Sequence, residues 1–163
     1  MVILKNVLVA TDFGEPAAKA LAYGQDLSRQ YSATLHVLHV ADDVTARYAT
    51  EIPMFTADEQ AQLEQSARAR VEALLSAEDR RQLSARAVVR SSLSPAAAIC
   101  DYAKTSRVDL IIMGTHGRSG MAHFLMGSVA ERIVRTAPCP VLTVRCPERE
   151  FIAPDALTTV SQA

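Results

Sequence analysis

Short apolar runs alternate with amphipathic stretches along most of the chain. The apolar runs are typical of strands buried on both faces of a parallel sheet, whereas the stretches between them repeat their apolar residues at helical spacing. Strands are predicted at 6–10, 34–40, 85–89, 108–113 and 141–144, and helices at 15–30, from 57, from 95 and at 128–137. This alternation predicts an α/β fold: an open parallel sheet with helices on both faces.

Right-handed crossovers between parallel strands leave few topologies, and the favoured one reverses the strand order once. The reversal opens a crevice at the carboxyl ends of the strands, where such sheets bind ligands. The helix starts carry recognisable signals, namely Pro16 in a first turn, a Thr56–Glu59 capping box and Ser94 as an N-cap before Pro95. Residues 41–56 are predicted as a loop, and the charged residues 78–82 as the exit of the preceding helix.

Leu63 and Val134 are predicted to face the core, because they lie on the apolar stripes of their helices. Residues 147–163 show no convincing periodicity, so the sequence predicts one domain over 1–146 followed by a mobile or partner-bound tail.

Composition excludes several classes of function. Seventeen basic and 18 acidic residues give a net charge of −1, which argues against nucleic-acid binding. No apolar run approaches the roughly 18 residues that a membrane span needs. The apolar run at the N-terminus is too short to be the core of a signal peptide. The cysteines, Cys100, Cys139 and Cys146, are odd in number and fit no zinc module. We therefore expect reduced thiols in a cytoplasmic protein.

The segment after the fourth strand is the most informative, with the spacing Gly114-x2-Gly117-x9-Gly127-Ser128. Glycines allow positive φ and a close approach of the backbone to a ligand. Gly127 and Ser128 stand where the last helix begins, so its exposed N–H groups form an anion site. The P-loop and the dinucleotide fingerprint are both absent from the chain.

This spacing, with Ala10-Thr11-Asp12 after the first strand and the ending 137–144, resembles the nucleotide-binding pattern of the universal stress protein family over about residues 3–146. The resemblance implies a Rossmann-like sheet in the order 3-2-1-4-5, with ATP between strands one and four. One branch of that family lacks the glycine spacing and does not bind ATP. This chain keeps the spacing, which predicts membership of the ATP-binding branch. It departs from many relatives at Gly14, where they carry a hydroxyl residue.

The resemblance also implies the contacts. Asp12 and the main chain of Ala10 and Val40 would hold adenine and ribose, and Met113 and Gly114 would border the ribose. The phosphates would follow a path lined by Thr115, Gly117 and Arg118, and would be capped by Gly127, Ser128 and Val129. Mg²⁺ could accompany the triphosphate, held mainly by phosphate oxygens and water.

Several of these residues allow simpler interpretations. Asp12 could cap the helix that Pro16 begins, and Arg118 could be a solvated loop residue. His116 has no carboxylate or nucleophile at a recognisable spacing, so it is interpreted as a loop histidine and no catalytic residue is assigned. His36 and His39 are three apart on a strand and face opposite sides, which excludes a shared metal ion.

Three functions remain open from the sequence. The first is an ATP-binding stress-response or signalling module that acts on a protein partner without fast catalysis. The second is a slow ATPase or phosphotransferase, and the third is a dimeric interaction module with a vestigial nucleotide site. A homodimer is predicted through the fifth strand, because Val141, Leu142, Thr143 and Val144 form an uncharged edge.

Overall fold

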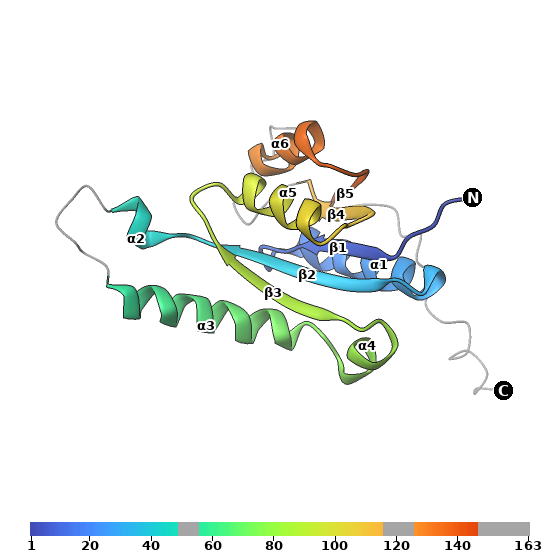
Figure 1. Ribbon diagram of the computed structural model, residues 1–163, viewed down its shortest axis with the longest axis horizontal. Coiled ribbons are helices and arrows are strands. Elements are labelled where there is room, and N and C mark those ends of the chain that lie inside the picture. Colours follow the sequence, from blue (N-terminus) through green and yellow to red (C-terminus); the bar gives the residue numbers. More distant parts are fainter. Residues whose placement is uncertain (49–55, 116–125, 147–163) are drawn as a thin grey trace.

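The sheet has five parallel strands, as the sequence predicted (Figure 1). The computed structural model describes residues 1–48, 56–115 and 126–146. The strands are β1 (Asn6–Ala10), β2 (Thr34–Ala41), β3 (Arg86–Ser91), β4 (Leu110–Gly114) and β5 (Val141–Val144). Their order is β3-β2-β1-β4-β5, which confirms the order that the family resemblance implied. The strand order reverses at β1. This strand pairs with β2 on one side and with β4 on the other.

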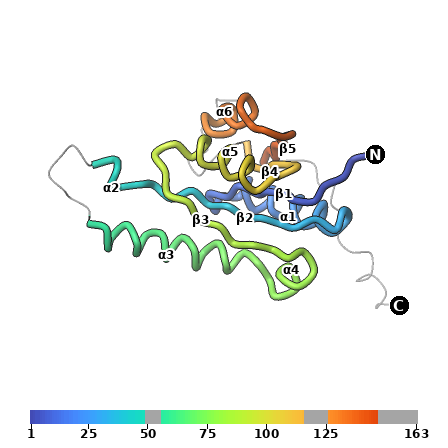
Figure 2. Tube along the Cα trace, viewed as in Figure 1, coloured from blue at the N-terminus to red at the C-terminus, as the bar shows by residue number. Residues whose placement is uncertain are grey.

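Helices cover both faces of this sheet (Figures 1 and 2). On one face lie α1 (Glu15–Tyr31), α3 (Ala57–Ala73) and α4 (Ala77–Gln82), over a core cluster that includes Val9 and Val37. On the other face lie α5 (Pro95–Thr105) and α6 (Ser128–Thr136), over a cluster that includes Leu8 and Ile111. Both faces of the central strands are therefore buried, which explains their unbroken apolar sequences.

Two short helices depart from the sequence prediction. Residues 41–56 were predicted as a loop, but they contain α2 (Val44–Arg47), which Asp43 caps by accepting a hydrogen bond from the N–H of Ala46. The charged stretch 78–82, predicted as a helix exit, instead forms most of α4. Ser76 and Asp79 form a capping box there, and Asp79 is buried because it also bonds Gln25 and Arg29 of α1. A carboxylate with several donors can be buried at moderate cost.

Two smaller predictions were wrong, and a third held in position only. Leu63 and Val134, predicted to face the core, are 46% and 49% exposed. Ser94 stands at the N-cap of α5 as predicted, but its side chain makes no capping hydrogen bond. The hydroxyl of Ser92 instead accepts a hydrogen bond from the N–H of Ser94 at 3.0 Å.

The two edges of the sheet differ in character. The edge strand β3 carries Arg86 and Arg90, both exposed. The opposite edge strand, β5, carries no charge, and its Leu142 is exposed. Within the described residues, no helix is both long enough and apolar enough to cross a membrane.

Candidate functional site

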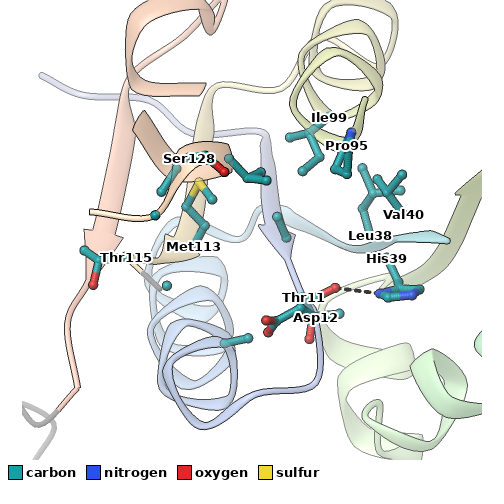
Figure 3. Close-up of a pocket in the computed structure, with 16 residues that line it drawn as sticks. Thr11, Asp12, Leu38, His39, Val40, Pro95, Ile99, Met113, Thr115 and Ser128 are labelled. Atoms are coloured by element: carbon teal, nitrogen blue, oxygen red, sulfur yellow. Dashed lines mark hydrogen bonds between the residues drawn. The ribbon is translucent and has the colours of Figure 1, made fainter. Parts of the chain in front are cut away.

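A cavity of about 310 Å³ opens at the carboxyl ends of β1 and β4, where the strand order reverses (Figure 3). Parallel sheets bind ligands at this position because two neighbouring crossovers leave it uncovered. The lining residues come from the ends of β1, β2 and β4 and from the first turns of α1, α5 and α6. They are Ala10, Thr11, Asp12, Ala17, Leu38, His39, Val40, Pro95, Ile99, Met113, Gly114, Thr115, Gly127, Ser128, Val129 and Ala130.

One end of the cavity is the N-terminus of α6. The N–H of Gly127 donates to the carbonyl oxygen of Thr115 at 2.7 Å, and the Gly127 carbonyl accepts the first intrahelical bond, from Glu131. The N–H groups of Ser128, Val129 and Ala130 have no acceptor among the described residues. Three unpaired amides at the positive end of a helix dipole bind an anion.

The opposite end of the cavity is apolar. Leu38 and Val40 of β2 face Pro95 and Ile99 of α5 across it, away from Ser128 and Thr115 (Figure 3). A planar aromatic ligand gains free energy by leaving water for such surroundings. The cavity can therefore hold a molecule with one anionic and one flat apolar end.

The Thr11–Asp12 turn lies between these two ends. The N–H of Phe13 donates to the Thr11 hydroxyl at 3.0 Å, and the N–H of Gly14 donates to Oδ1 of Asp12 at 2.9 Å. Nδ1 of His39 donates to the Thr11 carbonyl oxygen at 2.8 Å, the bond that is dashed in Figure 3. Asp12 therefore does not cap α1, since the N-cap is Gly14 and Asp12 bonds the N–H of that residue. It does line the cavity, and its contact with a ligand stays a prediction.

The two strand histidines lie on opposite faces of the sheet, as predicted. His36 is 3% exposed, and its Nδ1 and the Tyr102 hydroxyl share a hydrogen bond of 2.7 Å. Burial, together with the nearby positive charge of Arg86, lowers the pKa of His36 below its usual value. His39 instead packs against Phe13. No three His, Cys, Asp or Glu side chains within the described ranges are grouped so that they could hold a metal ion.

Comparison with known proteins decides the family. The model of the universal stress protein family matches residues 4–145. The chain belongs to the universal stress protein family. A universal stress protein of Thermus aquaticus is 33% identical over 147 residues, which cover 88% of this chain and 100% of the relative. Universal stress protein MJ0531 of Methanocaldococcus jannaschii is 48% identical over 56 residues, a match that spans 34% of this chain and 33% of that protein.

Solved structures of universal stress proteins and related chains share the fold. The hypothetical protein MJ0577 has a TM-score of 0.73 and 26% identity, with 91% of this chain and 100% of that chain covered. A universal stress protein of Archaeoglobus fulgidus, solved in complex with dAMP, has a TM-score of 0.57 and 16% identity over 88% of this chain and 99% of that one. A universal stress protein solved in complex with cAMP has a TM-score of 0.58 and 19% identity over 88% and 98%. At such identities these last two likenesses show the fold alone.

Most of the predicted site residues meet at the cavity. Those that line it are Ala10, Asp12, Val40, Met113, Gly114, Thr115, Gly127, Ser128 and Val129. Gly117 and Arg118, like His116, lie outside the described residues. The structure brings the predicted residues together, and their contact with a nucleotide stays a prediction.

Sequence reasoning missed the apolar end of the cavity. Leu38 and His39 stand directly before the predicted Val40 on β2, so strand continuity was an available signal. Pro95 and Ile99 reach the cavity because α5 crosses back over the sheet. No local motif in the sequence indicates that contact.

Positive φ, one of the two reasons expected for the glycines, was wrong at Gly114 and Gly127. Gly114 does not have a positive φ, and a Cβ built on it would lie 2.7 Å from Cβ of Pro16. This glycine is therefore required for the close approach of β4 to the first turn of α1. Gly127 is extended, with φ −72° and ψ 154°, which any residue can adopt.

Proposed function

We propose that this universal stress protein binds ATP and that nucleotide occupancy is the signal read by a protein partner. The observation that carries the proposal is the α6 N-terminus, where the N–H groups of Ser128, Val129 and Ala130 stand unpaired among the described residues at one end of a cavity whose other end is apolar. This arrangement matches the two halves of a nucleotide.

We propose one orientation for ATP in the cavity. The phosphates would lie against the α6 amides, each of which contributes about 1.5–3 kcal/mol when bonded to a charged oxygen. The adenine would lie between Val40 and Pro95, with Ala10 and Met113 below it. Asp12 would then face the ribose, whose hydroxyls can donate to a carboxylate. The universal stress proteins solved with dAMP and cAMP define adenine nucleotides as the class to be tested first.

We propose that Mg²⁺ arrives with the nucleotide. Since the described residues hold no cluster of three ligating side chains, the ion would be held mainly by phosphate oxygens and water. Gly117 and Arg118 would line the same phosphate path.

We propose that the protein binds ATP without fast catalysis. Backbone amides bind the charge of the ground state as well as the charge that develops in the transition state, and equal binding of both states lowers the barrier little. A slow ATPase or phosphotransferase remains the second candidate.

We also propose a homodimer that forms through β5. The carbonyl oxygens of Pro140 and Val144 accept hydrogen bonds from β4, at 3.0 and 2.8 Å. Alternate residues of a strand point their N–H and C=O groups to opposite sides, so Val141 and Thr143 direct theirs to the open edge. The three cysteines form no disulfide, which suits the cytoplasm as the place of action.

Native mass spectrometry of freshly purified protein tests the function. ATP bound to the wild type is the expected result, and an ATP complex that turns steadily into ADP would instead favour the ATPase. Protein that carries no nucleotide, and that gains none when ATP and Mg²⁺ are added, would favour the interaction module with a vestigial site. The same spectra count subunits, so they test the dimer in one measurement.

A further inference from the structure

Three side chains from different elements stack beside the cavity. The guanidinium carbon of Arg70 on α3 lies 3.8 Å from the ring centroid of Phe13, a cation–π contact. The rings of Phe13 and His39 are 4.5 Å apart between centroids and tilted by 42°. Phe13 therefore contacts side chains of both α3 and β2. We call Arg70, Phe13 and His39 the stack.

Phe13 has an unfavourable backbone conformation. Its φ is 67°, in the left-handed region that residues with a large side chain rarely adopt. Such a conformation persists where the surroundings over-determine it. The local hydrogen bond from the Phe13 N–H to the Thr11 hydroxyl contributes, and the stack supplies contacts on the ring.

The conformation of Phe13 sets the position of residues that line the cavity. Thr11 and Asp12 precede Phe13 directly, and both line the cavity. His39 contacts the ring of Phe13 and also donates to the carbonyl oxygen of Thr11, at 2.8 Å. A displacement of the ring would thus move the turn through its backbone and through His39.

We propose that Arg70 is a positioning residue for the nucleotide site, which it controls from outside through Phe13 and the Thr11–Asp12 turn. The proposal rests on the proposed function for its ligand. Of the described residues that line the cavity, none comes from α3. This helix would nevertheless set the affinity of the site, because the stack holds Asp12 where the ligand meets it.

A purely structural role for Arg70 is separable from this one. The side chain lies on an exposed part of α3, whose packing depends on the buried Ala67 and Val71. Gln60 anchors the start of the helix, because its Nε2 donates to the hydroxyl of Ser91 at 3.0 Å. Truncation of Arg70 should therefore leave α3 in place. Arg68 is exposed on the same helix and has no ion-pair, hydrogen-bond or ring partner among the described residues, so it provides the matched control.

The first experiment measures the Kd for ATP by calorimetry in single variants. Arg70→Ala should weaken binding about 2- to 5-fold, the range of an exposed cation–π contact. Arg70→Lys should restore affinity to within about 2-fold of wild type, because an ammonium also binds the ring face. Arg68→Ala should bind as the wild type does. An unchanged Kd in Arg70→Ala, or an equal loss in Arg68→Ala, would overturn the proposal.

The second experiment follows the backbone amides of Phe13 and Gly14 by NMR in protein without nucleotide. Arg70→Ala should displace both resonances, and Arg68→Ala should leave them in place. Phe13→Ala and Phe13→Gly extend the test, because both remove the ring but only glycine adopts positive φ freely. Phe13→Gly should then bind ATP more tightly than Phe13→Ala, and the reverse order would contradict a role for the turn.

These readouts also separate the proposal from the proposed function. If the wild type binds no adenine nucleotide, the proposed function fails, and the amide resonances alone decide whether Arg70 positions the turn. Displaced resonances in Arg70→Ala would then support the positioning role, and unmoved resonances would overturn it.

Discussion

The N–H of Gly127 donates to the carbonyl oxygen of Thr115 at 2.7 Å, which joins the end of β4 to the start of α6. The bond withdraws the Gly127 amide from the donors that a ligand could use. The first unpaired N–H of the helix, within the described part of the chain, is therefore that of Ser128. Gly127 borders the anion site as a surface without a side chain.

Substitution of Gly127 should block the phosphate end of the cavity. In the wild type, ATP at 100 times its Kd should add about 2.7 kcal/mol to the free energy of unfolding, or roughly 5–10 °C in Tm. Gly127→Val should remove this shift, because the valine methyl groups would occupy the space of the phosphates. The variant should still fold, since φ −72° and ψ 154° suit valine. A folded variant that keeps the full ATP shift would contradict the proposed site.

The open edge of β5 should mediate dimerisation. Thr143→Pro removes an N–H group that points away from β4, so the sheet should stay intact while pairing with a second copy is lost. Light scattering at tens of micromolar protein should give a dimer for the wild type and for Thr143→Val, and a monomer for Thr143→Pro. A monomeric wild type would end the proposal of a dimer.

ATP hydrolysis should be slow, well below the ~1–10³ s⁻¹ usual for enzymes. His116→Ala should leave both the affinity for ATP and the background rate within a few-fold of wild type, because the sequence marks no residue that would orient this imidazole. ADP release in the presence of Mg²⁺ measures the rate. Turnover above about 1 s⁻¹ that is lost in His116→Ala would assign the protein to the enzymes.

Two glycines should differ in what their substitution costs. Gly114→Ala places a Cβ 2.7 Å from Pro16 Cβ and 3.1 Å from the Pro16 carbonyl carbon, so α1 must shift beside the cavity. We expect a loss of about 1–3 kcal/mol in unfolding free energy together with weaker ATP binding. Gly24→Ala crowds Cγ2 of Val9 within the core, so it should lower stability and leave the affinity for ATP unchanged. Equal effects on affinity would contradict this assignment.

Stability should fall in mild acid because of His36. Its pKa is lowered in the folded protein by burial and by Arg86, whereas the unfolded chain binds a proton near the usual value of about 6.5. The unfolded state then binds more protons as the pH falls below 6.5, and unfolding becomes easier until the folded pKa is reached. Because one proton is involved, the slope has an upper limit of about 1.4 kcal/mol per pH unit.

Chemical denaturation between pH 7 and pH 5 measures this slope. His36→Gln does not titrate, so its unfolding free energy should depend less on pH than that of the wild type. Parallel curves for the two proteins would exclude His36 as the cause.

The alternation of strands and helices and the α6 end of the cavity were predictable from local patterns, whereas the strand order came from the family resemblance. Unbroken apolar strands require helices on both faces of the sheet. The position of Gly127-Ser128 at the start of a helix predicts an anion site from the local sequence alone. The apolar end of the cavity was not predictable in this way. Pro95 and Ile99 are distant in sequence from β1 and β4, and their position depends on how α5 packs after its crossover.

The periodicity of apolar residues along a helix also does not predict which of them are buried. Leu63 and Val134 lie on the predicted apolar stripes of their helices, yet both are exposed in the folded protein. Gly114 illustrates a related limit, since its spacing was correctly noted but its physical reason, contact with Pro16, is visible in three dimensions alone.

The contrast between the two edges of the sheet bears on how large an assembly can become. A sheet whose two edge strands can both pair with other copies can grow head to tail into an open filament. Here the exposed arginines of β3, Arg86 and Arg90, repel a second copy of the same strand. In the proposed homodimer, β5 of one copy would pair with β5 of the other. This isologous contact would use the uncharged edge of each sheet, so assembly would stop at two copies.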